Sequence, residues 1–123
     1  MRIVVAYKWT CDPEEATVRA DGTVDWRRVP AVGHAGETGT ATSRSRDVGG
    51  VQLRVVQYGA GYRADHWCAK GHIVHVLAGD LVIEHDDGRR FPLSAGMSWH
   101  APDDDGPPHR VVCATGATVF IVD

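Results

Sequence analysis

The sequence lacks a long apolar run, an excess of basic charge and a cysteine framework, and each absence excludes a class of protein. No apolar segment approaches the roughly 20 residues that a membrane helix needs. The 13 basic residues are scattered and outnumbered by 16 acidic ones, which argues against a nucleic-acid-binding surface. The three cysteines, Cys11, Cys68 and Cys113, are an odd number at no framework spacing, so free thiols are expected.

A signal peptide is not expected either. The apolar start MRIVVAY is one strand long and is followed by Lys8 and Trp9 rather than by a small-residue cleavage site. The expected location is therefore the cytoplasm. A chain of 123 residues, 43% of them hydrophobic, suits one domain with its own core.

Helical periodicity is also missing. No stretch of eleven or more residues keeps an apolar period of 3.6, and the best helix candidate, Asp12–Ala16, is a single turn. Instead, turn signals such as Gly49-Gly50 and Asp87-Gly88 alternate with short segments rich in Val, Ile, Leu and aromatic residues. These segments are Val51–Tyr58, Ile73–Leu77, Leu81–His85, Phe91–Leu93, Met97–Ala101, Arg110–Cys113 and Ala117–Val122. The pattern predicts an all-β sandwich or barrel.

The chain divides by character near its middle. Residues 1–50 are polar and irregular, and the segment GETGTATSRSRDVGG at residues 36–50 has the composition of a loop. Residues 51–123 are a dense series of predicted strands, and we expect the functional core there. We predict an N-terminal arm with extra strands at residues 1–35 and a barrel domain at residues 36–123.

Histidine is concentrated in one stretch of the sequence. Six of the seven histidines lie between positions 66 and 109: His66, His72, His75, His85, His100 and His109. Strand residues two apart point to one face, so His66 and Cys68 can project together, and His72 follows after a turn. Imidazole nitrogens and a thiolate suit Zn²⁺ or another borderline metal. His109 adds a fourth candidate, whereas Cys113 lies ~13 Å farther along its strand and cannot share that ion.

Two segments keep a fixed order of these residues. The first contains Gly61, His66-x-Cys68, three residues, His72, six residues and Gly79. The second contains Gly96, five residues, Pro102, an acidic loop, His109, three residues and Cys113. In residue types and gaps they resemble the two motifs of the cupin superfamily. More narrowly, the run ADHWCAKGHIVHVL with the later GMSW, PPHR and FIVD is similar to small bacterial single-domain cupins with a DHCW motif.

The resemblance covers about residues 36–123 and implies a small antiparallel β-barrel (a single-domain cupin, or jelly roll) with a metal centre inside, often as a homodimer. Carried over position by position, it implies the metal ligands His66, Cys68, His72 and His109. Cys68 stands in place of the motif's second His, and His72 in place of its Glu. This softer donor set favours Zn, with Fe, Cu or Ni as alternatives. Three His around Fe(II), with Cys68 as a bystander, stays open.

Further residues are candidates for the pocket. Tyr62, Trp67, Trp99 and Cys113 are assigned to its lining, although aromatic packing and a core position for Cys113 are the competing interpretations. His75, His85 and His100 are expected at the surface or rim. Tyr62 and Glu84 are the nearby candidates for a general acid or base.

Three functions remain open from the sequence. The barrel can be a metal-dependent enzyme of oxygenase or isomerase type, a small-molecule binding or sensing module, or a barrel with a structural zinc. The expected partners are a small-molecule ligand and a second copy of the chain, with no nucleic acid and no membrane. The first 26 residues resemble the start of an electron-transfer flavoprotein β subunit, but nothing after Trp26 matches, and no flavoprotein function is inferred.

Overall fold

The computed structural model describes residues 22–102 and 106–123, so the predicted turn of helix at Asp12–Ala16 and the strand at residues 1–9 lie outside the described residues. The described part is an antiparallel sheet of nine strands with one 3-10 turn, η2 (Trp26–Arg28). The strands are β1 (Val32–Ala35), β2 (Thr40–Val48), β3 (Val51–Tyr58), β4 (Tyr62–Arg63), β5 (His72–His85), β6 (Arg90–Ser94), β7 (Ser98–Ala101), β8 (His109–Cys113) and β9 (Ala117–Val122). The predicted all-β class is confirmed, and no helix in this part of the chain is long and apolar enough to span a membrane.

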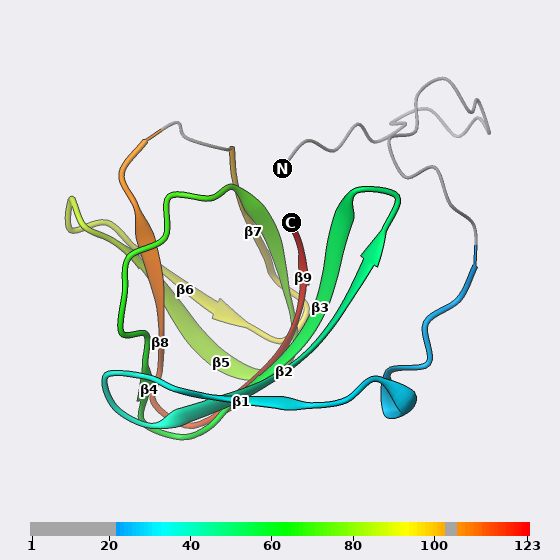
Figure 1. Ribbon diagram of the computed structural model, residues 1–123. Helices are drawn as coiled ribbons and strands as arrows, with labels where there is room; N and C mark the ends of the chain where they lie inside the picture. The colour runs from blue at the N-terminus through cyan, green and yellow to red at the C-terminus, as the bar shows by residue number, and fades with distance from the viewer. Residues whose placement is uncertain (1–21, 103–105) are drawn as a thin grey trace.

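The sheet curls around a single interior (Figure 1). Its strand order is β1-β2-β3-β9-β5-β8-β4, and β6 and β7 both pair with the long strand β5. The strands β3, β9, β5 and β8 are therefore consecutive neighbours, although they are far apart in the sequence. Side chains that point inward from these four strands therefore lie next to one another, and they form the site described below.

The turn between β1 and β2 closes one side of the barrel. Thr38 pairs with Arg63 of β4 through two backbone contacts: Glu37 donates to the Arg63 carbonyl at 2.8 Å, and Arg63 donates to the Thr38 carbonyl at 3.0 Å. A side chain at Gly39 (φ +68°) would meet the backbone of Tyr62 at 2.7–2.8 Å. The glycines of the GETG segment thus allow this close approach of two backbones.

The loop-like interpretation of residues 36–50 is wrong, because Thr40–Val48 forms β2. It pairs with β3 without interruption from Ala41 opposite Tyr58 to Val48 opposite Val51. Gly49 (φ +55°) and Gly50 (φ +84°) make the two-residue turn of this hairpin, which requires left-handed backbone at both positions. Most of the strand is polar because one face meets solvent, and that composition conceals it in the sequence.

The strands predicted at Val51–Tyr58 and Ala117–Val122 match β3 and β9. The segments Ile73–Leu77 and Leu81–His85, predicted as separate strands, belong to the one strand β5, which has a register shift between Val76 and Ala78. The extra residue reverses the alternation. As a result, His72, Val74 and Val76 point inward before the bulge, and Leu81, Ile83 and His85 do so after it.

Gly79 provides a test of the bulged strand. Its φ is +78°, and an added Cβ would meet the Gly116 carbonyl oxygen and, at 2.9 Å, Ala117 Cα. Gly88 is also left-handed (φ +95°), but an added Cβ there meets nothing within 4 Å. We expect Gly88→Ala to lower the free energy of unfolding by about 1–2 kcal/mol, the cost of left-handed backbone. Gly79→Ala should cost clearly more in urea denaturation, and equal losses would contradict the register of β5 against β9.

Candidate functional site

The four predicted metal ligands line one cavity. His66, Cys68, His72 and His109 all contribute to a cavity of about 150 Å³ between β3, β5, β8 and the segment that follows β4. Imidazoles from two separate parts of the chain therefore do meet in the interior of the sheet. His72 is the first residue of β5 and His109 the first of β8.

The rings of His72 and His109 are in direct contact, edge to face. Their Nε2 atoms are 2.7 Å apart, and both side chains are buried. On its other side, His72 Nδ1 lies 2.8 Å from Oδ1 of Asp123, which follows β9. Asp123 Oδ2 in turn lies 2.8 Å from Nη2 of Arg54 on β3. The result is a polar chain of four side chains, Arg54–Asp123–His72–His109, across four neighbouring strands.

This chain fixes the proton positions. Burial alone would raise the pKa of Asp123, but the hydrogen bond from His72 and the charge of Arg54 hold it below its ordinary value. The ionised carboxylate accepts the Nδ1 proton of His72, and the two Nε2 atoms of His72 and His109 share one hydrogen bond. Burial, with the neighbouring His72 and His85, lowers the pKa of His109 to about 4. Near pH 7 His109 is therefore neutral, the form that binds metals.

His66 and Cys68 are placed differently from the expectation. Neither residue lies on a strand. Cys68 forms an isolated bridge, in which its backbone exchanges hydrogen bonds of 2.8 and 2.9 Å with the backbone of His109. The His66 side chain is 75% exposed, and its Nδ1 lies 2.7 Å from Asp65 Oδ1. Within residues 22–102 and 106–123, no three His, Cys, Asp or Glu side chains stand close enough to hold an ion as drawn.

The donor chemistry nevertheless fits a borderline divalent metal. Two imidazoles converge, and one of them is oriented by a carboxylate, as metal-binding histidines usually are. A thiol and a third imidazole line the same cavity. For a third ligand to join, the segment 65–70 must turn His66 or Cys68 toward the His72–His109 pair.

No family model matches the sequence, and no curated protein matches it either. Solved structures do resemble it. A sugar phosphate isomerase "from a cupin superfamily" of Silicibacter pomeroyi aligns with 82% of this chain and 74% of its own, at 22% identity and a TM-score of 0.67. A cupin-like protein of Thermotoga maritima aligns over 70% and 69%, at 18% identity and a TM-score of 0.60. Ectoine synthase from P. lautus aligns over 69% and 64%, at 22% identity and a TM-score of 0.56.

The chain has a cupin fold. The resemblance inferred from the two motifs is thereby confirmed at the level of the fold. The narrower likeness to DHCW-motif cupins stays a prediction.

Around the cavity, the aromatic candidates have separate positions. Tyr62 lines the cavity, and its ring centroid lies 5.0 Å from that of Tyr58. Trp99 is buried and packs against His109 and His72 at centroid distances of 4.6 and 5.6 Å, so it forms a wall behind the pair. Trp67 is 40% exposed, with the Arg110 guanidinium 4.3 Å from its ring centre.

Two further candidate site residues, Cys113 and Glu84, make their contacts outside the cavity. Cys113 has no exposed surface; it packs in the core, and its Sγ donates to the Asp80 carbonyl at 3.3 Å. Glu84 is ion-paired with Arg110 at 2.7 Å and with Arg90 at 3.3 Å, and it does not line the cavity.

The expectation that His85 lies at the surface is wrong. It is buried beside His109 at a ring centroid distance of 5.9 Å, and its Nδ1 lies 3.1 Å from the Pro107 carbonyl oxygen. His85 continues the alternation of Leu81 and Ile83, and this signal was available in the sequence. His100 is exposed and His75 partly exposed, as expected for the outer face.

Sequence patterns did not identify Arg54 or Asp123 as site residues. The alternation of Ala117, Val119 and Ile121 does place Asp123 on the inner face. Its pairing with a histidine 51 residues away has no local signal.

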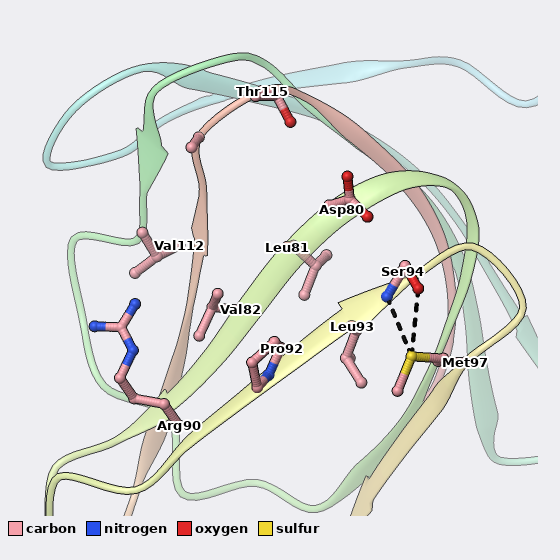
Figure 2. A pocket seen from close by; sticks show the side chains of 11 residues that line it. Asp80, Leu81, Val82, Arg90, Pro92, Leu93, Ser94, Met97, Val112 and Thr115 are labelled. Atoms are coloured by element: carbon pink, nitrogen blue, oxygen red, sulfur yellow. Dashed lines mark hydrogen bonds between the residues drawn. The ribbon is translucent and has the colours of Figure 1, made fainter.

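Another depression lies away from these residues. A cavity of about 510 Å³ lies between β5, β6 and β8. Figure 2 shows the side chains that line it, among them the apolar Leu81, Pro92 and Leu93. Ser94 donates through its backbone N and its Oγ to Met97 Sδ at its edge. It contains no histidine or cysteine, so the candidate site is the smaller cavity at His72 and His109.

The lowered pKa of His109 predicts an acid-sensitive fold. The unfolded ring titrates near 6.5 and the folded ring at about 4, so the unfolded state takes up the proton first as the pH falls. The stability from the neutral ring is present above pH 6.5 and is lost toward pH 4, by about 3 kcal/mol at most. Urea unfolding of metal-free protein between pH 7 and 4.5 measures it. His109→Gln should flatten the slope, and an unchanged slope would contradict this assignment.

Proposed function

We propose that this cupin binds a divalent metal ion, most favourably zinc, at His72 and His109, and binds or transforms a small molecule beside it. His66 and Cys68 are the candidates for the further ligand. The observation that carries the proposal is the 2.7 Å approach of two buried imidazole nitrogens, backed by Asp123. The two buried rings are satisfied by the hydrogen bonds to each other and to Asp123, and a bound metal would take the place of the bond between their Nε2 atoms.

The protein's own groups prepare the ligands. Asp123 accepts the proton of His72 Nδ1 and so turns Nε2 of the same ring toward His109. Arg54 keeps Asp123 ionised, and Trp99 excludes water from behind both rings. A bound metal would supply Lewis-acid polarisation of an oxygen atom of the ligand. Tyr62 lines the same cavity and supplies a hydroxyl that can orient that ligand or hold a proton, and burial, with Asp65 nearby, raises its pKa.

The ligand count separates catalysis or binding from a structural zinc. Three protein ligands leave a position open for a small molecule, whereas His₃Cys closes the site. The exposure of His66 favours the open arrangement, because this ring has to leave solvent to bind. Two structural neighbours are a sugar phosphate isomerase and ectoine synthase, and both names support this class of function. A homodimer in the cytoplasm remains part of the proposal.

Metal content of purified variants tests the proposal. His72→Ala and His109→Ala should each lose bound zinc in elemental analysis, whereas His75→Ala, on the outer face of the same strand, should retain it. Asp123→Asn should weaken zinc affinity by roughly 10–100-fold, the usual effect of losing a carboxylate behind a ligating histidine. Full zinc occupancy in both His72→Ala and His109→Ala would refute the site.

Cys68→Ser separates the alternatives for the thiol. If the thiolate is a ligand, the variant loses zinc, and cobalt-loaded wild-type protein shows a thiolate charge-transfer band that the variant lacks. Unchanged metal content and no such band would make Cys68 a bystander and leave a three-histidine site. Circular dichroism of both proteins controls for folding.

A further inference from the structure

A second, larger cavity adjoins the one at His72 and His109. It measures about 520 Å³ and lies along the inner face of β1, β2 and β3. Four residues line both cavities: Arg54, Tyr58, Tyr62 and His66. The smaller cavity, at about 150 Å³, is below the usual size of a ligand pocket, about 300–1,000 Å³. A ligand that reaches His72 and His109 therefore extends past Tyr62 into the larger space.

Arg54 stands at the junction and is incompletely paired. Within the part of the chain that the structure describes, its one partner is Asp123, reached through Nη2. Its Nε is buried with no hydrogen-bond partner. A guanidinium carries five N–H donors, and one contact leaves most of them unused. Arg110 also lines the smaller cavity, but it is already neutralised by Glu84 at 2.7 Å. Arg54 is thus the cation in these walls with the most unused donors, and its planar fork matches a carboxylate or a phosphate.

Apart from Asp65, whose carboxylate is paired with His66 at 2.7 Å, the rest of the larger cavity offers small polar groups. His34 Nε2 and Ser43 Oγ lie 2.8 Å apart on β1 and β2, and Tyr58 and Tyr62 contribute phenol groups. Each of these groups can both donate and accept a hydrogen bond, as ligand hydroxyl groups require.

We infer that the ligand is a small anion bearing several hydroxyl groups, with its carboxylate or phosphate at Arg54 and its hydroxyl groups along His34 and Ser43. This inference rests on the proposed function, in which the other end of the ligand lies at the metal.

Isothermal titration calorimetry of the zinc-loaded protein tests the inference with four probes. Gluconate and sorbitol 6-phosphate carry both features, sorbitol lacks the charge, and hexanoate lacks the hydroxyl groups. We expect gluconate or sorbitol 6-phosphate to bind at least about tenfold more tightly than sorbitol and hexanoate, the scale of one charge-assisted hydrogen bond. The tighter of the two identifies the anion as carboxylate or phosphate. Equal affinity for all four probes, or no binding, overturns the inference.

Variants locate the subsite. Arg54→Gln should abolish the preference for the charged probe, and Arg46→Gln, an exposed arginine on the outer face of β2, should keep it. Because Arg54→Gln also removes a partner of buried Asp123, its fold is checked by circular dichroism. If it does not fold, His34→Gln decides: a several-fold loss of affinity for the hydroxylated probe supports the inference, and unchanged affinity overturns it.

Zinc content of the same samples keeps the two proposals distinct. Protein that holds zinc but binds all four probes equally keeps the metal function and loses the anion subsite. Protein that holds no zinc, yet prefers the charged probe in an Arg54-dependent way, loses the metal function and keeps the subsite.

Discussion

The hydrogen bond from His72 to Asp123 is the interaction on which the candidate site depends. It joins the start of β5 to the residue after β9 and sets which nitrogen of His72 faces the cavity. Arg54 from β3 stands behind the carboxylate, and His109 from β8 stands in front of the ring. Because β3, β9, β5 and β8 are consecutive in the sheet, one row of inward positions supplies the whole polar chain. The curl of the sheet then brings the segment with His66 and Cys68 against this row.

The rest of the interior is mostly apolar, so the polar chain Arg54–Asp123–His72–His109 occupies positions where apolar side chains would otherwise pack. Val74, Val76, Ile83 and Val119 are almost fully buried on the same strands and make an apolar core. Asp123 is as deeply buried, and a buried ion pair contributes little net stability compared with well-packed apolar side chains. The polar row is therefore explained by what it holds in position: two imidazole rings at one end, and at the other a guanidinium whose Nε has no hydrogen-bond partner among the described residues.

Much of the fold was predictable from the sequence because strand alternation and turn glycines are local signals. Val51–Tyr58 and Ala117–Val122 were found with their exact bounds, and the two motifs indicated a cupin before any coordinates. Strand β2 was missed because Thr, Ser and Arg dominate it, and its pairing with β3 rather than its composition makes it a strand. The surface position predicted for His85 was wrong because the alternation of Leu81 and Ile83 continues to the end of the strand and places His85 inward.

The site was predictable only in part. Motif spacing selected four residues that line one cavity, but it did not show that His66 would face solvent or that Cys68 would lie outside a regular strand. Arg54 belongs to no motif, and Asp123 ends the FIVD segment, in which no site residue was predicted. The contacts of both residues arise from strand order, which a single sequence does not reveal. The same holds for the larger cavity, whose walls come from β1, β2 and β3.

X-ray absorption spectroscopy of the zinc-loaded protein tests the central claim most directly, since it reports the atoms bound to the metal. The account predicts at least two imidazole nitrogens at about 2.0–2.1 Å, with a sulfur at about 2.3 Å if Cys68 is a ligand. A shell of oxygen atoms alone, without the multiple-scattering signature of imidazole, would contradict it.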